Sequence, residues 1–279
     1  MAGKGKAIQF IKMHSTGNDC IIIDTQKSKF SESPRLVRKI LNRTTGIGAD
    51  QLLLLSKSRK GADFKVRIFN ADGSEAEMCG NGVRCIGRYI KDEQYTKKRD
   101  VDIETLAGVR QVRVSSKSVT VNLGEPRLKG KEIPVRLSGR IINRPIKVEN
   151  KDFRVTCLSL GNPHCIIFQE NLESFDIQKY GPLLENHQIF PNRSNIGFVN
   201  VLSPQQMQMR VWERGVGETG SCGTCAGAAI VAAVLNGFSD RKTKIDLPGG
   251  HLEVEWDKES NCVSLTGPVE KIFEGAYWL

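Results

Sequence analysis

Alternating polar and apolar positions mark strands at matching places along the chain. Residues 64–69 read Phe-Lys-Val-Arg-Ile-Phe, and residues 207–212 read Met-Gln-Met-Arg-Val-Trp. Such alternation is typical of a strand with one buried face. Residues 108–123 and 250–266 each contain two alternating runs joined by a short polar turn, as in a hairpin. The pattern therefore predicts sheets built largely from antiparallel neighbours.

The chain repeats itself. Gly-Asn followed by an apolar run occurs at Gly17 and recurs at Gly161, an offset of 144, and a Cys-Gly pair at Cys79 recurs at Cys222, an offset of 143. Landmarks in one order at nearly constant spacing indicate an internal duplication. We expect an α+β fold of two pseudo-symmetric domains, each a mostly antiparallel or mixed sheet wrapped around a central helix. The expected boundaries are 1–124 and 125–267, with 268–279 able to return to the first domain.

Helical signals begin directly after the two repeated cysteines. The first helix is predicted from about Asn81 to Lys91, and the second covers 226–235, which is small and apolar on all sides and should be buried by its own sheet. Cys79 and Cys222 then stand at helix N-termini, where unpaired N–H groups and the helix dipole lower the pKa of a thiol. Both are candidate bases.

The residues after each cysteine suit an anionic guest. Gly80 and Gly223 let the backbone approach a carboxylate, and Asn81 and Thr224 follow them. If the duplication places the helix N-termini face to face, a small carboxylate between them has one sulfur on each side of its α-carbon. One thiolate removes the α-proton and the opposite thiol protonates the other face. This chemistry is two-base inversion of an amino acid, and it needs no cofactor.

Composition leaves one alternative from another class. The 279 residues are 39% apolar and 26% charged, which excludes a disordered or low-complexity protein. The net charge of +10 allows a nucleic-acid-binding protein. However, much of the excess lies in residues 125–151, without the interleaved aromatic residues that single-strand binding needs. We interpret that stretch as a solvated connecting segment and expect no nucleic-acid partner.

The sequence also favours an intracellular location. The longest nearly unbroken apolar run, 226–235, is too short to span a bilayer, and no signal-peptide core follows the basic start of the chain. The eight cysteines are then expected to be reduced thiols. We expect a cytoplasmic protein that does not bind membranes and forms a homodimer.

The spacing of the cysteines is compatible with a metal site at one place in the chain. Cys222 and Cys225 have the spacing of half a zinc site or of a redox pair, but no second close pair of Cys or His residues completes it. We therefore expect no metal. The remaining cysteines lie in apolar or strand-like stretches and are expected to be buried packing residues: Cys20, Cys85, Cys157, Cys165 and Cys262.

A set of motifs covering essentially the whole chain resembles the diaminopimelate epimerase family, in the family's order. The motifs are Met13–Asp19, Gly46–Gln51, Phe69–Ser74, Cys79–Arg84, Gly161–His164, Arg193–Asn195, Glu213–Gly215 and Cys222–Thr224. The resemblance implies a cofactor-independent enzyme that interconverts LL- and meso-diaminopimelate on the pathway to lysine and the cell wall. It also implies a site in the cleft between two domains.

The resemblance implies roles for individual residues. Cys79 and Cys222 match the family's two bases, and His164 and Glu213 match positions that support the chemistry. The reacting carboxylate would be bound by Gly80, Asn81, Gly223 and Thr224, and the rest of the substrate by Asn18, Gln51, Asn70, Asn162, Asn195, Glu213 and Arg214. Amides, one carboxylate and one guanidinium are the groups that a zwitterionic substrate end requires. Read without the family, the four asparagines could simply form turns.

The chain departs from the family in a few places. Ser15 replaces the usual glycine of the first motif, Cys20 stands where an aromatic is common, Cys225 stands where glycine is usual, and Gly227 where a cysteine is frequent. The change beside Cys222 leaves open which thiol is the second base. A racemase acting on proline or histidine remains an alternative on the same fold. A phenazine-type isomerase is disfavoured, because that group lacks the paired cysteines.

Overall fold

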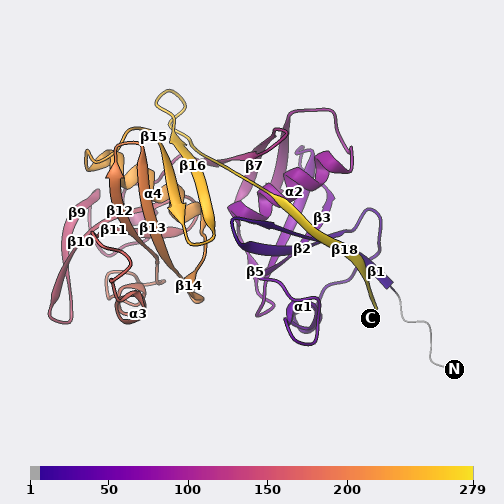
Figure 1. Ribbon diagram of the computed structural model, residues 1–279, viewed down its shortest axis with the longest axis horizontal. Coiled ribbons are helices and arrows are strands. Elements are labelled where there is room, and N and C mark those ends of the chain that lie inside the picture. Colours follow the sequence, from indigo (N-terminus) through magenta and orange to yellow (C-terminus); the bar gives the residue numbers. More distant parts are fainter. Residues whose placement is uncertain (1–6, 279) are drawn as a thin grey trace. The chain divides into compact units, whose positions relative to one another are not determined.

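The computed structural model describes residues 7–278 and divides the chain into two compact units (Figure 1). Unit 1 contains the residues up to Val121 together with those from Pro268 onward, and unit 2 contains Asn122–Gly267. The boundary falls within one strand, β8 (Val119–Gly124). Each unit has its own sheet and its own central helix.

The sheet of unit 1 has the order β18-β1-β2-β3-β4-β6-β7-β8. The pairs β2–β3 and β4–β6 are parallel, and the other neighbours are antiparallel. Its remaining strands are β1 (Ala7–Ser15), β2 (Asn18–Asp24), β3 (Gln51–Lys57), β4 (Phe64–Asn70), β6 (Asp100–Thr105), β7 (Gly108–Val114) and β18 (Glu270–Trp278), with the short β5 (Glu75–Ala76) beside β4. The helices are α1 (Pro34–Leu41) and α2 (Gly80–Asp92).

The sheet of unit 2 has the order β9-β10-β11-β12-β13-β15-β16-β17. Here β11–β12 and β13–β15 are the parallel pairs. Its strands are β9 (Ile141–Val148), β10 (Lys151–Ser159), β11 (Pro163–Phe168), β12 (Asn195–Ser203), β13 (Gln206–Glu213), β15 (Lys242–Leu247), β16 (Gly250–Trp256) and β17 (Val263–Gly267), with the short β14 (Gly217–Thr219) beside β13. The helices are α3 (Ile177–Glu185) and α4 (Gly223–Leu235).

The two sheets share one topology. The strand sequence β1-β2-β3-β4-β6-β7-β8 of unit 1 recurs as β10-β11-β12-β13-β15-β16-β17 of unit 2, with parallel pairs at the same places. A further strand, β18 or β9, pairs with the first strand of each series. The predicted α+β class and internal duplication are confirmed.

Both central helices begin directly after a cysteine, as predicted, although α4 starts at Gly223 rather than Ala226. Every residue of α4 from Gly223 to Ala233 is buried, because small apolar residues on all sides let the strands of unit 2 enclose it (Figure 1). On α2, a Cβ at Gly87 would lie 2.5 Å from Val112 Cγ1. Glycine at that position allows the helix to approach β7 closely.

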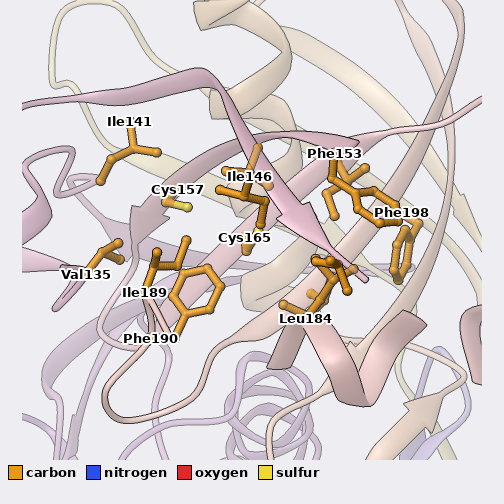
Figure 2. Close-up of a cluster of buried hydrophobic side chains, with 14 of the residues drawn as sticks. Val135, Ile141, Ile146, Phe153, Cys157, Cys165, Leu184, Ile189, Phe190 and Phe198 are labelled. Carbon is orange, nitrogen blue, oxygen red and sulfur yellow. The ribbon is translucent and has the colours of Figure 1, made fainter. Parts of the chain in front are cut away.

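The prediction of a solvated connecting segment at 125–151 is wrong. This stretch contains a 3-10 turn (Gly130–Glu132) and β9, which pairs along β10. Its apolar side chains enter the core of unit 2, where Val135, Ile141 and Ile146 pack with Cys157 and Phe198 (Figure 2). The charges hid the strand, because residues 143–145 in the middle of β9 are exposed and interrupt the alternation of apolar positions.

The expectation for the five packing cysteines holds for four of them. Cys20, Cys85, Cys157 and Cys165 are buried, and all eight cysteines of the chain are free thiols. Cys262 is instead partly exposed, because it precedes β17 rather than lying within it. A residue just outside a strand has no sheet face to pack against.

Candidate functional site

Cys79 and Cys222 are the N-cap residues of α2 and α4. Both have an extended backbone, with φ −140° and ψ 114° at Cys79 and φ −130° and ψ 109° at Cys222. The Cys79 sulfur accepts a hydrogen bond from the backbone N–H of Gly82 at 3.4 Å. The Cys222 sulfur lies 3.5 Å from the Thr224 hydroxyl. An N-cap sulfur is therefore held beside helix N–H groups that favour negative charge.

In unit 1 the amide side chains gather beside the start of α2. Asn18 Oδ1 lies 3.8 Å from the Cys79 sulfur. Gln51, the first residue of β3, donates from Nε2 to Oδ1 of Asn70, the last residue of β4, at 3.3 Å. The side-chain oxygen Oε1 of Gln51 is 3.5 Å from where a Cβ of Gly82 would lie. Strand ends thus bring Asn18, Gln51 and Asn70 to the first turn of α2.

Asp50 is a residue of this cluster to which the sequence assigned no role. Its carboxylate accepts from Asn18 Nδ2 at 3.1 Å and from Arg43 Nη2 at 2.7 Å. Because Asp50 engages the amide nitrogen of Asn18, the oxygen of Asn18 is directed to the Cys79 sulfur, from which it accepts a hydrogen bond when Cys79 carries its proton. The signal in the sequence that could have identified Asp50 is its position directly before a strand, β3, whose first residue was already assigned to the site.

Unit 2 assembles a matching cluster around Cys222. Asn162 donates from Nδ2 to the Thr224 hydroxyl at 3.3 Å, and the same hydroxyl contacts the Cys222 sulfur. His164 Nε2 lies 2.8 Å from Asn162 Oδ1. Since an amide oxygen only accepts, the hydrogen-bond network assigns the ring proton to Nε2. His164 therefore orients the amide that contacts Thr224.

His164 is neutral at physiological pH. Its ring is completely buried, and this burial, together with the charge of Arg214, lowers the pKa of His164 to about 3. Within residues 7–278, its Nδ1 has no hydrogen-bond partner. A neutral ring with one nitrogen donating and the other unprotonated is suited to holding neighbouring groups in place.

Glu213 is the last residue of β13, and Arg214 is the first residue of the turn that follows. Asn195 Oδ1 accepts from the backbone N–H of Arg214 at 3.0 Å, and the Glu213 carboxylate accepts from the Thr219 hydroxyl at 2.5 Å. Sequence reasoning missed Glu185, a buried carboxylate at the end of α3. It accepts from Gly215 N and from Trp212 Nε1, both at 2.8 Å. The Glu185 carboxylate thereby holds the residues on both sides of Glu213 and Arg214, through the indole of Trp212 and the backbone of Gly215.

Cys225, the departure beside Cys222, lies in the core of unit 2. Its thiol is fully buried, and burial, with a hydrogen bond to Cys222, raises its pKa well above the ordinary value. Its sulfur packs against Gly197 of β12. A thiol held protonated in this way is unsuited to act as a base.

Apart from His164 and Arg214, the residues assigned to the site fall into two equivalent sets. Each set takes one amide at or directly before the start of the second strand, one at the start of the third strand, a polar residue at the end of the fourth, and the N-cap and first turn of the central helix. The sets are Asn18, Gln51, Asn70, Cys79, Gly80 and Asn81 in unit 1, and Asn162, Asn195, Glu213, Cys222, Gly223 and Thr224 in unit 2. The duplication therefore gives each unit one such set, a half-site, around a cysteine.

Two further observations concern other classes of site. Within residues 7–278, no three His, Cys, Asp or Glu side chains gather in a way that could hold a metal ion. Over the same residues, no helix has both the length and the apolar character needed to cross a bilayer.

Comparison with known proteins identifies the family. The family model described as diaminopimelate epimerase matches residues 10–129 and 156–272. The diaminopimelate epimerase of Acetivibrio thermocellus is 44% identical over 274 residues, covering 96% of this chain and 98% of its own. That of Methanococcus maripaludis strain C6 is 44% identical over 275 residues, covering 96% of this chain and 99% of its own.

Solved structures share the fold. A hydroxyproline epimerase from Agrobacterium vitis superposes with a TM-score of 0.73 at 12% identity, covering 98% of this chain and 93% of its own. A phenazine biosynthesis protein of the PhzF family from Bacillus anthracis gives a TM-score of 0.70 at 18% identity, covering 98% of this chain and 100% of its own. At these identities the likeness establishes the fold alone. The family match and the identity over nearly the whole length establish that the chain belongs to the diaminopimelate epimerase family, whose members are isomerases.

Proposed function

We propose that this protein interconverts LL- and meso-diaminopimelate by two-base inversion at the α-carbon, with Cys79 and Cys222 as the bases. The observation that carries the proposal is the equivalence of the two cysteines, each the N-cap of the central helix in one half of a duplicated fold. Inversion needs a base on one face of the carbon and an acid on the other. One cysteine from each unit meets that need.

The reaction balances without an added reagent. One cysteine, as thiolate, takes the α-proton and becomes a thiol, and the C–H electron pair is left on the substrate as an enediolate. The other cysteine gives its proton to the opposite face and becomes a thiolate. The negative charge that develops on the carboxylate is stabilised by N–H groups of the first turns of α2 and α4, where Gly80, Asn81, Gly223 and Thr224 lie. One well-placed donor of this kind contributes about 3 to 4 kcal/mol.

The other polar residues bind the rest of the substrate and set specificity. Glu213 and Arg214 offer a carboxylate for the distal ammonium and a guanidinium for the distal carboxylate. Asn18, Gln51, Asn70, Asn162 and Asn195 offer amides that both donate and accept. Within this scheme His164 is a positioning residue, because it is neutral and acts through Asn162.

We also propose that the protein is a cytoplasmic homodimer. Among the described residues, β18 pairs only with β1 and leaves its other edge open. It exposes Ile272, Phe273 and Trp278, which are 48%, 44% and 65% accessible. An apolar edge strand is a ready surface for a second copy of the chain. Light scattering of wild type and of Phe273→Lys tests this. A monomeric wild type would contradict the homodimer, and a Phe273→Lys protein that is still dimeric would contradict pairing through this edge.

The decisive experiment is incubation with LL-diaminopimelate in deuterated water. We expect meso-diaminopimelate to form with one deuterium at the inverted α-carbon, because each proton that is removed exchanges with solvent before the next turnover. L-proline and L-histidine serve as competing substrates. Conversion of proline or histidine without conversion of diaminopimelate would replace the proposal with an amino-acid racemase of another specificity.

A further inference from the structure

Arg84, on the second turn of α2, is a fully buried guanidinium. Its Nε and Nη2 donate to the Ser15 hydroxyl at 3.1 and 2.6 Å, and Nη2 also donates to Asn81 Oδ1 at 2.8 Å. Ser15 in turn donates to the carbonyl of Pro268 at 2.7 Å. All these partners are neutral. Among residues 7–278, Nη1 has no acceptor, and no carboxylate forms an ion pair with this guanidinium.

A buried charge without a counter-ion is costly, so its presence needs a reason. Burial lowers the pKa of Arg84 only to about 10, so the group is charged at neutral pH. The thiols with which it interacts electrostatically are those of Cys85 and Cys79. Cys85 is buried, whereas Cys79 is partly exposed at the helix start. Cys79 is the group on which a compensating negative charge can reside and still be reached by a substrate.

The other half of the duplicated fold lacks this charge. Cys79 and Cys222 are 143 residues apart, and the same offset takes Arg84 to Gly227. A Cβ at Gly227 would lie 2.7 Å from Leu123, 2.9 Å from Leu160 and 3.2 Å from Val263. In unit 2, apolar side chains therefore fill the position that corresponds to the Arg84 side chain. The two half-sites have the same backbone arrangement, but only the half-site of unit 1 has this buried positive charge.

Other ionisable groups on the elements packed against α2 do not offset Arg84. Cys20 of β2 is a buried thiol whose pKa is raised by a hydrogen bond to Cys85 and by burial. Burial lowers the pKa of Arg110 of β7, and no neighbouring charge contributes to that shift. Asp24 of β2 faces α2 as a buried carboxylate, but it accepts from the hydroxyls of Tyr89 and Tyr95 and, among residues 7–278, forms no hydrogen bond or ion pair with Arg84. Lys57 of β3 is exposed. The remaining groups form ion pairs: Lys12 and Arg43 with Asp19, Arg43 with Asp50, His14 with Glu270, Lys65 with Glu104, Arg67 with Glu75 and Glu32, and Arg113 with Asp100.

We propose that Arg84 makes the two bases unequal, so that the resting enzyme holds its thiolate at Cys79 and its neutral thiol at Cys222. Arg84 is then a positioning residue, which fixes Asn81 and supplies the positive charge behind Cys79. Ser15 gives that guanidinium a neutral acceptor without cancelling its charge. The inference rests on the proposed function, but the ionisation of the two thiols is measured without substrate.

The test is the pH dependence of alkylation by iodoacetamide, followed for each cysteine peptide by mass spectrometry on the full-length protein without substrate. Thiolates react and thiols do not, so the midpoint of the rate reports ionisation. In the wild type we expect a lower midpoint for Cys79 than for Cys222. In Arg84→Met the Cys79 midpoint should rise by about one pH unit, the lower end of the effect of a nearby opposite charge. Arg84→Lys, which keeps the charge, should restore most of the shift.

Two controls are built into the chain. Arg88 lies one turn later on α2 and donates to the Ser116 carbonyl at 3.0 Å, so Arg88→Met removes an arginine of the same helix without removing this charge. Cys262 is a partly exposed thiol of unit 2 whose midpoint should not move in any variant. Thermal unfolding shows which variants are folded.

The outcomes separate cleanly. A Cys79 midpoint at or above that of Cys222 in the wild type overturns the proposal even if Arg84→Met does not fold. A folded Arg84→Met protein with an unchanged Cys79 midpoint also overturns it, as does an equal shift in Arg88→Met. Failure of the diaminopimelate assay with the alkylation shift intact would instead contradict the proposed substrate and leave the assignment of the thiolate standing.

Discussion

The imidazole of His164 donates from Nε2 to Asn162 Oδ1 over 2.8 Å, and the residue is completely buried. The ring is neutral there, and it is linked through Asn162 and Thr224 to the sulfur of Cys222. A histidine beside a reactive thiol is often assigned a proton-transfer role. Here the histidine is placed to hold an amide, and this placement has a consequence for stability.

His164 should make the protein less stable in mild acid. The unfolded ring binds a proton with a pKa near 6.5, whereas the folded ring does so only at about 3. The contribution of the neutral, buried ring to the free energy of unfolding is therefore fully present above pH 6.5 and is lost as the pH falls toward 3. Relative to His164→Gln, the free energy of unfolding of the wild type should fall by roughly 2 kcal/mol between pH 6.5 and 4.5. Urea unfolding at four pH values measures this, and parallel pH curves for the two proteins would contradict it.

Cys79→Ala and Cys222→Ala should each abolish epimerisation. A positioned acid or base contributes about 10²- to 10⁴-fold to the rate, and inversion needs both groups. Formation of meso- from LL-diaminopimelate is the assay, and thermal unfolding shows that each variant folds. Near-normal turnover by either variant would mean that the two-base assignment is wrong.

Cys225→Ala should keep most of the activity. The buried thiol is held protonated, and its sulfur packs against Gly197 and forms a hydrogen bond with Cys222. The loss of one sulfur from the core costs about 1 kcal/mol of stability, a typical value for a small core truncation. Turnover and thermal unfolding of Cys225→Ala and Cys222→Ala should be compared side by side. An inactive Cys225→Ala beside an active Cys222→Ala would move the second base to Cys225.

Arg214→Ala should weaken the binding of diaminopimelate. Its guanidinium is the proposed partner of the distal carboxylate, and a hydrogen bond to a charged group is worth roughly 1.5 to 3 kcal/mol. This corresponds to a rise in KM of about 10- to 150-fold. Arg193→Ala is a matched control, because Arg193 pairs with Glu185 beneath the same turn rather than with substrate. Equal KM values for Arg214→Ala and wild type would remove Arg214 from the substrate site.

Gly87→Ala should destabilise unit 1. The added Cβ would lie 2.5 Å from Val112 Cγ1, so α2 or β7 must shift. Overpacking of a core by one methyl group costs about 1 to 3 kcal/mol. Val112→Ala in the same chain should recover part of this loss by making room. Urea unfolding of the single and double variants is the measurement, and a Gly87→Ala protein as stable as wild type would show that the helix approaches β7 less closely.

Part of the fold can be predicted from local patterns in the sequence. Alternation at 64–69 and 207–212 predicted β4 and β13, and the Cys-Gly steps predicted the starts of α2 and α4 within a few residues. Equal spacing of these signals predicted the duplication, which the shared strand order confirms. Such features follow from the periodicity of neighbouring residues, which any window of the sequence contains. The sequence by itself determined the duplication, the helix starts and the family, because each can be read from short runs of neighbouring residues.

Other features depend on residues far apart in the chain. Tertiary structure alone decided that Glu185 fixes the turn at 213–215, that β9 belongs to the core, and that Arg84 reaches Ser15 across 69 positions. Long-range packing sets which groups are buried and whether a charge has a partner. The difference between the two half-sites therefore emerges only when the strands and helices are assembled.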